Sequence, residues 1–526
     1  MHTNLAHWVA NSAESRPDAI ALIHKKTELD YAALWQAITR EALALSTLPL
    51  SPQQRVAVYL PKQIETVISF FAANLAGLVF VPVNPVLKAG QVQHILNDCH
   101  VRVLITSSSR WQSLKENLLE CPGLDWVILV DDSTETGLPA LPYALLSWFD
   151  FLGQAATKPL PATIDTQMAA ILYTSGSTGK PKGVVLSHRN MICGAQSVAE
   201  YLEITEHDRL LAALPFSFDY GLNQLTTAML KGGQCVLLDY LLPRDVVLAL
   251  DRYRITGLAA VPPLWAQLAK INWPDEAGNG LRYLTNSGGK MPKAVLDAIR
   301  AKAPKARFYL MYGLTEAFRS TYLPPEQIDR RPDSMGKAIP NAEVLVVRPD
   351  GTPCAPHEPG ELVHKGSLVA MGYWNDPVKT AERFKPAPGA LAELPLTEIA
   401  VWSGDRVTLD EEGYLYFVGR TDDMIKTSGY RVSPTEVEEV LYASGQVSEA
   451  AAIGIEHPTL GQAVVAVVSV ETGVTLDAAI LKNHCRAKLP NFMVPERIEQ
   501  LSALPKNANG KIDRKALVGQ FQDLYR

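Results

Sequence analysis

The sequence predicts an α/β protein with a separate small domain after residue 421, and three observations carry this prediction. Apolar strand-like segments alternate with helical ones along most of the 526 residues, which is typical of sheets covered by helices. The chain is 47% hydrophobic and 20% charged, which is ordinary for a globular protein of several domain-sized units. Near residue 422 the alternation stops at a polar segment, and a compact βαββα pattern follows.

Residues 1–150 alternate strands with helices. The apolar runs at 55–60, 78–83, 101–106 and 126–130 predict strands, and the one at 65–76 predicts a buried helix. The segment 66–86 is the most apolar of the chain, but Asn, Gly and Pro residues interrupt it, so we expect no membrane span there. A stretch rich in Pro, Thr and Ala at 157–167 predicts a loop between two subdomains.

A second α/β run follows this loop. Its strands are expected at 169–173, 209–213, 234–238, 257–261, 281–287 and 307–312. From 339 to 417 short strands alternate with Gly- and Pro-containing turns, which favours a small β-barrel-like subdomain. We therefore expect a large N-terminal domain at 1–421, made of two stacked α/β subdomains and the β-rich one, and a small mobile α+β domain at 422–526.

Composition disfavours several classes of function. Forty-nine Lys and Arg against 55 Asp and Glu give a net charge of −6, so nucleic acid is not an expected partner. The six cysteines are scattered, without CxxC or zinc-like spacing, which is typical of a reduced compartment. The first residues lack the basic and apolar pattern of a signal peptide. We expect a cytoplasmic protein without a membrane span.

The most informative segment is the loop at 173–183. It holds three glycines, two lysines and four Ser or Thr side chains between two apolar strands. Glycines let backbone N–H groups approach a ligand, and hydroxyls and lysines bind phosphate oxygens. Pro181 follows Lys180, and a strand rather than a helix comes next, so this is not a Walker A loop. The segment predicts a polyphosphate-binding loop.

Four further motifs follow this loop in order. They are Tyr312-Gly313-Leu314-Thr315-Glu316, Trp402-Ser403-Gly404-Asp405, the segment 419–431, and Pro505-Lys506-Asn507-Ala508-Asn509-Gly510-Lys511. Together the five resemble the signatures of the adenylate-forming superfamily, which contains acyl-CoA synthetases, nonribosomal-peptide adenylation domains and luciferases. The resemblance spans essentially the whole chain. The segments 216–225 and 311–325 are most similar to AMP-forming acyl-CoA ligases associated with bacterial exosortase A systems.

The resemblance implies a two-step reaction. A carboxylate attacks the α-phosphorus of ATP, giving an acyl-adenylate and pyrophosphate, and a thiol then attacks the acyl carbonyl while AMP leaves. ATP and Mg²⁺ are the implied cofactors, and the acceptor is CoA or the phosphopantetheine thiol of a carrier protein. Since the first step brings an anion to a polyanion, the protein must position the reactants and neutralise charge.

The resemblance assigns one set of residues to the nucleotide. The 174–183 loop would hold the β- and γ-phosphates, Tyr312 would stack on adenine, and Asp405, assisted by Arg420, would accept hydrogen bonds from the ribose hydroxyls. The complete set is Thr174, Ser175, Gly176, Ser177, Thr178, Gly179, Lys180, Gly183, Ser287, Gly288, Gly289, Tyr312, Gly313, Asp405 and Arg420.

A second set would act on the reacting groups. Glu316 would bind Mg²⁺, Thr315 the α-phosphate and Lys182 the pyrophosphate oxygens, while Lys511 would bridge the substrate carboxylate and the α-phosphate. The small domain would then rotate about a hinge to present its other face to the thiol. The residues implied here are Asp422 for the hinge and Lys426, Gly429 and Tyr430 for the thiol side.

The acid should lie against Phe218, Asp219, Tyr220 and Asn223. Phe218 resembles an aromatic gate at which many acyl-CoA synthetases have His. Amino-acid-activating members place an Asp at the position of Asp219 to pair with the substrate ammonium, but backbone N–H groups could equally satisfy this carboxylate. Arg319 could bind a second substrate carboxylate, although a surface arginine is the simpler expectation.

The leading prediction is an AMP-forming acid–thiol ligase acting on CoA. The alternative is an amino-acid adenylation enzyme that loads a carrier protein. A luciferase-type oxygenase is disfavoured, because nothing in the sequence adds oxygen chemistry. A non-catalytic nucleotide-binding protein would be indicated by loss of Glu316, Asp405 or Lys511, and all three are present.

Overall fold

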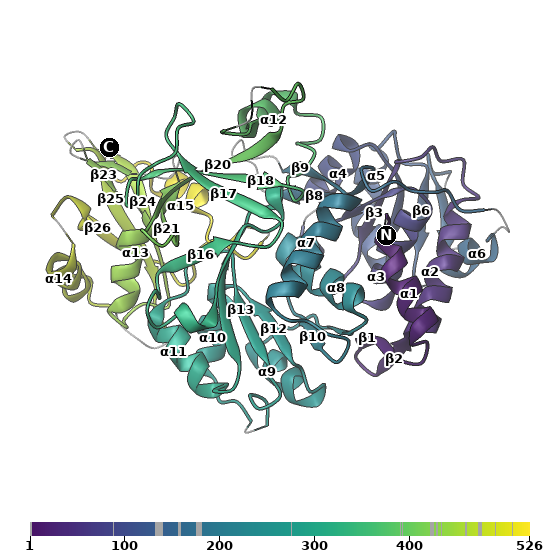
Figure 1. Ribbon diagram of the computed structural model, residues 1–526, viewed down its shortest axis with the longest axis horizontal. Coiled ribbons are helices and arrows are strands. Elements are labelled where there is room, and N and C mark those ends of the chain that lie inside the picture. Colours follow the sequence, from purple (N-terminus) through teal and green to yellow (C-terminus); the bar gives the residue numbers. More distant parts are fainter. Residues whose placement is uncertain are drawn as a thin grey trace.

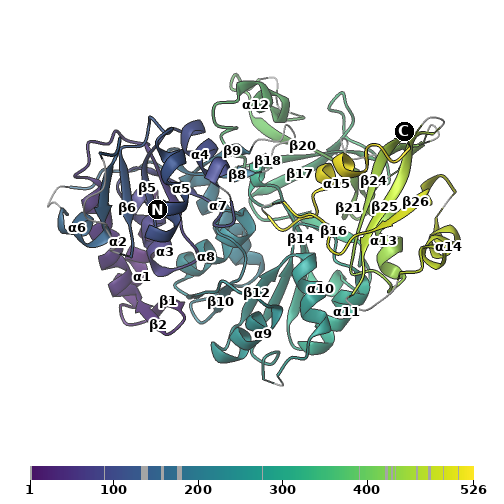
Figure 2. The same cartoon turned by 180° about the vertical axis from the view of Figure 1, so that it is seen from behind.

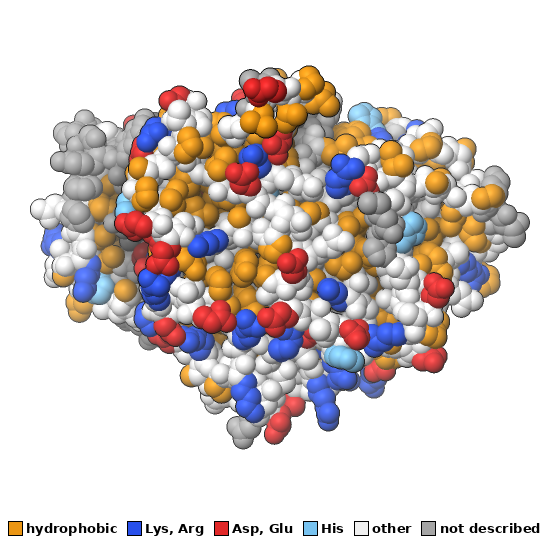
Figure 3. All heavy atoms as spheres, in the orientation of Figure 1, with side chains coloured by type: hydrophobic (Ala, Val, Ile, Leu, Met, Phe, Trp, Pro, Cys, Tyr) orange, Lys and Arg blue, Asp and Glu red, His pale blue; other side chains and the backbone are white. Residues whose placement is uncertain are grey.

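Figure 1 shows two α/β subdomains, an antiparallel region and a small C-terminal domain. The computed structural model describes residues 3–525 apart from 88, 132–139, 156–158, 175–180, 275, 390, 392, 421–424, 428–429, 433, 458–459, 472–475, 490 and 508. For residues 263, 420, 426, 430, 431, 436 and 492 the backbone alone is described. Basic and acidic side chains are interspersed among the described residues on the face drawn in Figure 3.

The first subdomain is a mostly parallel sheet with the strand order β7-β6-β5-β3-β4-β8-β9. Its elements are β3 (Arg55–Tyr59), α3 (Ile64–Leu75), β4 (Val79–Pro82), α4 (Ala89–Asp98), β5 (Val101–Thr106), α5 (Ser108–Leu118), β6 (Trp126–Leu129), β7 (Ala144–Ser147), α6 (Trp148–Gly153), β8 (Met168–Thr174) and β9 (Lys182–Ser187). Val56 and Val58 enter one buried cluster while Ala57 and Tyr59 enter another, so both faces of the sheet are covered. This explains why its strands read as continuous apolar runs.

The second sheet is wider and has the order β17-β18-β20-β21-β16-β15-β14-β13-β12-β10-β11-β1-β2. Its α/β part comprises α1 (Ala6–Ser15), β1 (Ile20–His24), β2 (Thr27–Asp30), α2 (Tyr31–Leu45), α7 (His188–Tyr201), β10 (Arg209–Ala212), α8 (Asp219–Lys231), β11 (Gln234–Leu237), α9 (Pro243–Arg252), β12 (Gly257–Ala260), α10 (Pro262–Lys270), β13 (Tyr283–Asn286), α11 (Lys293–Lys302) and β14 (Arg307–Tyr312). Helices α7 and α8 pack together between the two sheets, α7 on β8 and β9 and α8 on β10 and β11 (Figure 1). The two α/β subdomains therefore stack through these helices.

Antiparallel strands continue the second sheet beyond β14. They are β15 (Thr321–Leu323), β16 (Ser334–Ala338), β17 (Ala342–Val347), β18 (Gly360–Gly366), β19 (Phe384–Pro386), β20 (Ile399–Leu409) and β21 (Leu415–Arg420), with η1 (Thr315–Ala317), η2 (Pro325–Gln327) and α12 (Pro377–Arg383) between them. The β-rich region expected at 339–417 is confirmed. All the strands predicted for the α/β region are also present, with ends that differ by at most two residues.

The small domain has its own core on both faces of a sheet ordered β23-β22-β25-β24, with β26 on β25. Its elements are β22 (Ile425–Thr427), β23 (Tyr430–Val432), α13 (Pro434–Ala443), β24 (Glu449–His457), β25 (Gly461–Ser469), α14 (Ala478–Lys488), η3 (Asn491–Met493), β26 (Arg497–Gln500) and α15 (Arg514–Phe521). The predicted βαββα pattern corresponds to β23, α13, β24, β25 and α14. The predicted boundary at 422 lies outside the described residues. Both views place this domain beside α10 and α11 (Figures 1 and 2).

The apolar run at 66–86 forms α3 and β4, as expected. Among the described residues, no helix has the length and apolar character that a membrane crossing requires. A helix of buried Phe and Ala residues followed by a buried strand accounts for the run.

Glu41 on α2 gives a testable prediction about stability. Its carboxyl group is fully buried and has no ion-pair partner among the described residues, and burial raises its pKa to about 8, with Ser69 opposing the shift. The unfolded chain loses this proton near pH 4.5, so the folded state loses stability as pH rises from about 4.5 to 8. We expect Glu41→Gln to be more stable than wild type at pH 8 by about 4 kcal/mol, with little difference near pH 4.5.

Urea unfolding at pH 5 and pH 8 would measure this difference. The exposed Glu28 provides the matched control, because Glu28→Gln should change stability equally at both pH values. A Glu41→Gln variant whose stability relative to wild type does not change with pH would contradict a neutral Glu41.

Candidate active site

The predicted site residues meet where parallel strands of the second sheet end. Strands β10, β12, β13 and β14 are parallel neighbours, so the loops after them emerge at one edge of the sheet. These loops carry the start of α8, the segment 287–289 and the segment 313–316. Side-chain contacts join them: the Thr315 hydroxyl donates to Asp219 (3.1 Å), and Arg319 Nη1 donates to the Ser287 hydroxyl (3.2 Å).

A second cluster surrounds Glu316. Lys182 Nζ lies 3.3 Å from Glu316 Oε1 and 3.8 Å from the centroid of the Tyr373 ring. The Tyr373 hydroxyl donates to the same Oε1 at 2.5 Å. Burial by itself would raise the pKa of Glu316, but Lys182 and the Tyr373 hydrogen bond hold that pKa below its ordinary value. The carboxylate is therefore ionised at neutral pH, and an ionised carboxylate oxygen suits Mg²⁺.

Lys182 reaches this cluster from the β8–β9 hairpin. Thr174 pairs with Lys182 across the hairpin, and Gly183 pairs with Tyr173. A Cβ on Gly183 would lie 2.7 Å from an Ile171 methyl carbon, so only glycine fits there. Burial lowers the pKa of Lys182, and Glu316 opposes that shift. The predicted loop residues Ser175, Gly176, Ser177, Thr178, Gly179 and Lys180 lie outside the described residues.

Tyr373 was not predicted from the sequence. The sequence signal near it is Gly372, the preceding glycine. In the structure Gly372 has φ +119°, and a Cβ there would lie 2.8 Å from Thr380 Cγ2. A glycine that the backbone requires, followed by aromatic side chains, indicates a fixed turn. It does not indicate which residue the aromatic side chain will contact.

Tyr312 and Asp405, predicted for adenine and ribose, are direct neighbours. The Tyr312 hydroxyl donates to Asp405 Oδ2. Asp405 is buried in β20, opposite Arg420 of β21, and its backbone N–H donates to the Ser403 hydroxyl at 3.1 Å. The side chain of Arg420 lies outside the described residues.

The predicted acyl-pocket residues lie at the start of α8. Asp219 is buried; Thr315 hydrogen-bonds Oδ1, and Arg319 Nη2 lies 3.9 Å from Oδ2. Burial raises the pKa of Asp219, and Arg319, Lys511 and Thr315 oppose the shift. The Tyr220 hydroxyl hydrogen-bonds Thr285, and the buried Asn223 donates to Thr226 at 3.5 Å. The Asp219 carboxylate therefore has a hydroxyl donor and a nearby cation.

The expectation that Arg319 is a surface arginine was wrong. Its side chain is 1% exposed and lies over the Tyr220 ring, with Cζ 4.8 Å from the ring centroid. Phe318 has φ +55° and turns the chain back, so that the Ser320 N–H bonds the Tyr312 carbonyl. Gly313 leaves room for the Arg319 stem, since a Cβ on it would lie 3.4 Å from Arg319 Cδ.

Lys511 of the small domain reaches the large domain. Its Nζ lies 5.8 Å from the Phe218 ring centroid, and its Cε would lie 3.4 Å from a Cβ placed on Gly288. Asn507 shapes the turn that presents it: Asn507 Oδ1 accepts the N–H groups of Asn509 and Lys511, and its own N–H donates to the Lys511 carbonyl. The domains also share ion pairs, Lys290 with Glu439 at 2.6 Å and Lys270 with Glu471.

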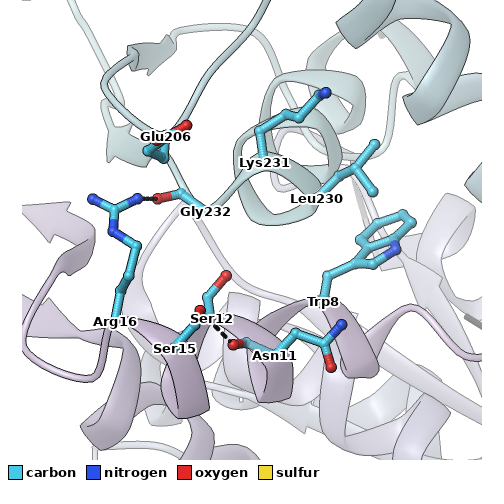
Figure 4. Close-up of a pocket in the computed structure, with 9 residues that line it drawn as sticks. All are labelled: Trp8, Asn11, Ser12, Ser15, Arg16, Glu206, Leu230, Lys231 and Gly232. Atoms are coloured by element: carbon cyan, nitrogen blue, oxygen red, sulfur yellow. Dashed lines mark hydrogen bonds between the residues drawn. The ribbon is translucent and has the colours of Figure 1, made fainter.

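The remaining predicted residues lie apart from these contacts or outside the described residues. Lys426 and Tyr430 belong to the β22–β23 hairpin, where only their backbone is described. Gly429 and Asp422 lie outside the described residues. A surface pocket of about 200 Å³ between α1 and the end of α8 is lined by Trp8, Arg16 and Lys231 among others, and none of its lining residues is a predicted site residue (Figure 4).

The chain matches one family along most of its length. The AMP-binding enzyme profile matches residues 9–374, and the AMP-binding enzyme C-terminal domain profile matches residues 436–511. The chain belongs to the AMP-binding enzyme family. The motif residues that form the contacts described above lie mostly within the two matched ranges.

Relatives of this AMP-binding enzyme include proteins whose names give CoA as the acceptor and proteins whose names give a carrier protein. Feruloyl-CoA synthase of Amycolatopsis is 30% identical over 521 residues, 97% of each chain. The L-proline–[L-prolyl-carrier protein] ligase of Pseudomonas fluorescens is 29% identical over 531 residues, 99% of each. A linear gramicidin synthase protein of Brevibacillus parabrevis is 31% identical over 507 residues, 96% of this chain but 6% of that protein. The chain thus spans a small part of the gramicidin synthase proteins that it matches.

Solved structures of similar enzymes share the whole fold. The anthranilate CoA ligase AuaEII with anthranoyl-AMP has a TM-score of 0.89 at 25% identity, over 99% of this chain and 98% of that one. The o-succinylbenzoate CoA synthetase of Bacillus subtilis with ATP and a magnesium ion has a TM-score of 0.82 at 27% identity, over 98% and 99%. The superfamily and fold predictions are therefore confirmed.

Proposed function

We propose that the chain is an AMP-forming acid–thiol ligase that activates a carboxylic acid with ATP and transfers the acyl group to CoA. In the first step a carboxylate oxygen bonds the α-phosphorus as the bond to pyrophosphate breaks. In the second the CoA sulfur bonds the acyl carbon, its proton leaves to solvent, and AMP departs. The contact of Lys511 with the large domain at Gly288 and Phe218 supports this proposal most, because a cation there can neutralise two anions that must meet.

The other predicted residues have roles that fit their contacts. Glu316 would hold Mg²⁺, which supplies charge neutralisation to the phosphates when bound. Lys182, which pairs with Glu316 here, would use its flexible stem to turn in part from Glu316 to the phosphate oxygens. Asp405, fixed by Tyr312, would accept the ribose hydroxyls. Residues 1–421 would carry these groups, and residues 422–526 would rotate about Asp422 to bring Lys426, Gly429 and Tyr430 to the thiol.

A carrier-protein thiol is the second candidate acceptor, because one relative is named as a carrier-protein ligase for proline. Asp219 would favour an amino-acid substrate if its carboxylate lacked a cation. Arg319 lies 3.9 Å away, so a substrate ammonium beside Asp219 would also face the guanidinium charge. This geometry favours an acid without a free amine, and we therefore propose CoA as the acceptor.

Exchange of labelled pyrophosphate into ATP across a panel of acids tests the first step. Exchange should depend on acid and Mg²⁺, and CoA should then be acylated faster than a holo-carrier protein. No exchange with any acid would indicate a binding-only protein, while exchange with proline and other amino acids followed by carrier loading would favour the second candidate.

The ion pair between Lys290 and Glu439 gives a prediction about domain arrangement. It joins the two domains while Lys511 lies in the site, so it should stabilise the adenylate-forming arrangement. Exposed pairs contribute about 0.2–1 kcal/mol, and Glu439→Lys adds repulsion, so adenylation should slow about two- to tenfold. The matched control is Glu496→Lys, an exposed residue of the same domain. Equal rates for both variants in pyrophosphate exchange would show that the ion pair does not affect this arrangement.

We also propose a cytoplasmic location. All six cysteines are free and buried, as expected where thiols stay reduced. The association with exosortase A systems stays a prediction.

A further inference from the structure

Arg319 is a buried cation whose hydrogen-bonding capacity is largely unused. A guanidinium carries five N–H donors. Nη1 donates to the Ser287 hydroxyl at 3.2 Å, but Nε and Nη2 are buried and have no hydrogen-bond partner among the described residues. Burying a charged group without filling its donors costs free energy, so a specific reason is needed for this arginine.

The Asp219 carboxylate does not fill these donors. Its nearest oxygen is 3.9 Å from Nη2, beyond hydrogen-bond length, and its other oxygen accepts the Thr315 hydroxyl. An arginine that only held this carboxylate in place would be expected to form two parallel hydrogen bonds with it. Arg331, in the same chain, shows what a buried arginine with a structural role looks like: it is 7% exposed, and all three of its nitrogens donate, to Asp410, Gln327 and Glu412.

The unused donors lie among the residues that should surround the acid. Arg319 stacks on the ring of Tyr220, bonds Ser287 and faces Asp219. These neighbours come from the start of α8 and from the loop after β13, the two segments expected beside the acyl group and the adenylate. A substrate held there would bring its non-reacting end towards Nε and Nη2.

We infer that the acid substrate carries a second oxygen acceptor, a carboxylate or carbonyl oxygen remote from the reacting carboxylate, and that Arg319 binds it. This inference rests on the proposed function. A planar guanidinium with two adjacent free donors suits an oxygen acceptor and disfavours an amine. Because the donors would otherwise stay unfilled, an acid that lacks the second oxygen should bind much more weakly.

The test compares acids that carry a second oxygen group with parent acids that lack it. Pyrophosphate exchange is measured for hexanoate, 5-oxohexanoate and adipate, and for benzoate, the three acetylbenzoates and the three phthalates. The wild type should show kcat/KM at least tenfold higher for an oxygen-bearing acid than for its parent. Comparison of the keto acids with the dicarboxylic acids shows whether the second oxygen group that Arg319 prefers is a carbonyl or a carboxylate. A wild type that prefers the parent acids would overturn the inference.

Variants assign the preference to Arg319. Arg319→Met should lower kcat/KM for the oxygen-bearing acid at least tenfold more than for its parent, mainly through KM, and Arg319→Lys should restore part of the preference if the group is a carboxylate. The matched control is Arg331→Met, a buried arginine whose partners are complete, which should lower stability without changing the acid preference. Equal losses for both acids in Arg319→Met would overturn the inference.

Two outcomes separate this inference from the proposed function. Exchange that occurs but ignores the second oxygen would overturn the inference alone. No exchange with any acid would overturn the proposed function and the inference with it. If Arg319→Met did not fold, as judged by thermal unfolding, the wild-type panel and Arg319→Lys would still decide.

Discussion

Lys511→Ala should slow acyl-adenylate formation about 10²–10³-fold, while thioester formation from a supplied acyl-adenylate stays within about threefold of wild type. The reason is the position of the lysine in the structure. Its ammonium lies 5.8 Å from the Phe218 ring centroid, and its Cε lies next to Gly288, where the acid and the α-phosphate should meet. In the second step no anion approaches another. Removal of the Lys511 charge should therefore have little effect on the rate of thioester formation.

The two half-reactions can be measured separately. Pyrophosphate exchange reports the first, and release of AMP from a synthetic acyl-adenylate in the presence of CoA reports the second. Lys515 is exposed on α15, four residues further on, and Lys515→Ala should change neither rate. If Lys511→Ala slowed both half-reactions equally, the lysine would act on structure or on both steps, and the proposed division of labour would fail.

The turn that carries Lys511 explains why a lysine on a small domain can be placed so specifically. Asn507 closes the turn through both its backbone and its side chain, Lys506 pairs with Glu449 at 2.6 Å, and Arg514 pairs with Glu438 at 2.8 Å. These contacts fix the turn to β24 and α13. Movement of the lysine should therefore occur with the whole domain rather than within the turn.

Local patterns were sufficient to predict most of the fold and to select several residues that the structure brings together. Strands β3, β5, β10 and β14 are buried on both faces and consist mainly of apolar residues. Their burial can therefore be predicted from their own residues. Thr315 and Glu316 follow β14, and their surroundings follow from the parallel order of the sheet, whereas Asp405 lies in the antiparallel strand β20.

Features that depend on distant segments could not be predicted in this way. Strand β1 pairs with β11, which is more than two hundred residues further along, and nothing in its own composition indicates that partner. Tyr373 contacts Glu316 only because the antiparallel region folds back over the β8–β9 hairpin. The burial of Arg319 depends on the positive φ of Phe318 and on the space beside Gly313.

Glu316→Gln should lower adenylation about 10²–10³-fold and raise the Mg²⁺ concentration needed for half-maximal rate. The substitution keeps the shape of the side chain and removes its charge, which Lys182 and Tyr373 hold in place. Because the pKa of Glu316 is lowered, its carboxylate stays ionised above about pH 4.5. The negative charge is lost only as pH falls through the folded-state pKa. The Mg²⁺ requirement of the wild type should therefore be constant from about pH 6 to 8.

Two further variants make this prediction specific. Tyr373→Phe removes the hydroxyl that bonds Glu316 but keeps the ring beneath Lys182, so it should slow adenylation about tenfold or less. Glu382→Gln, an exposed residue of α12, is the matched control and should leave the Mg²⁺ titration unchanged. A Glu316→Gln enzyme with a normal Mg²⁺ titration would place the metal elsewhere, and Lys182 with Glu316 would then be only a buried ion pair that positions the β8–β9 hairpin.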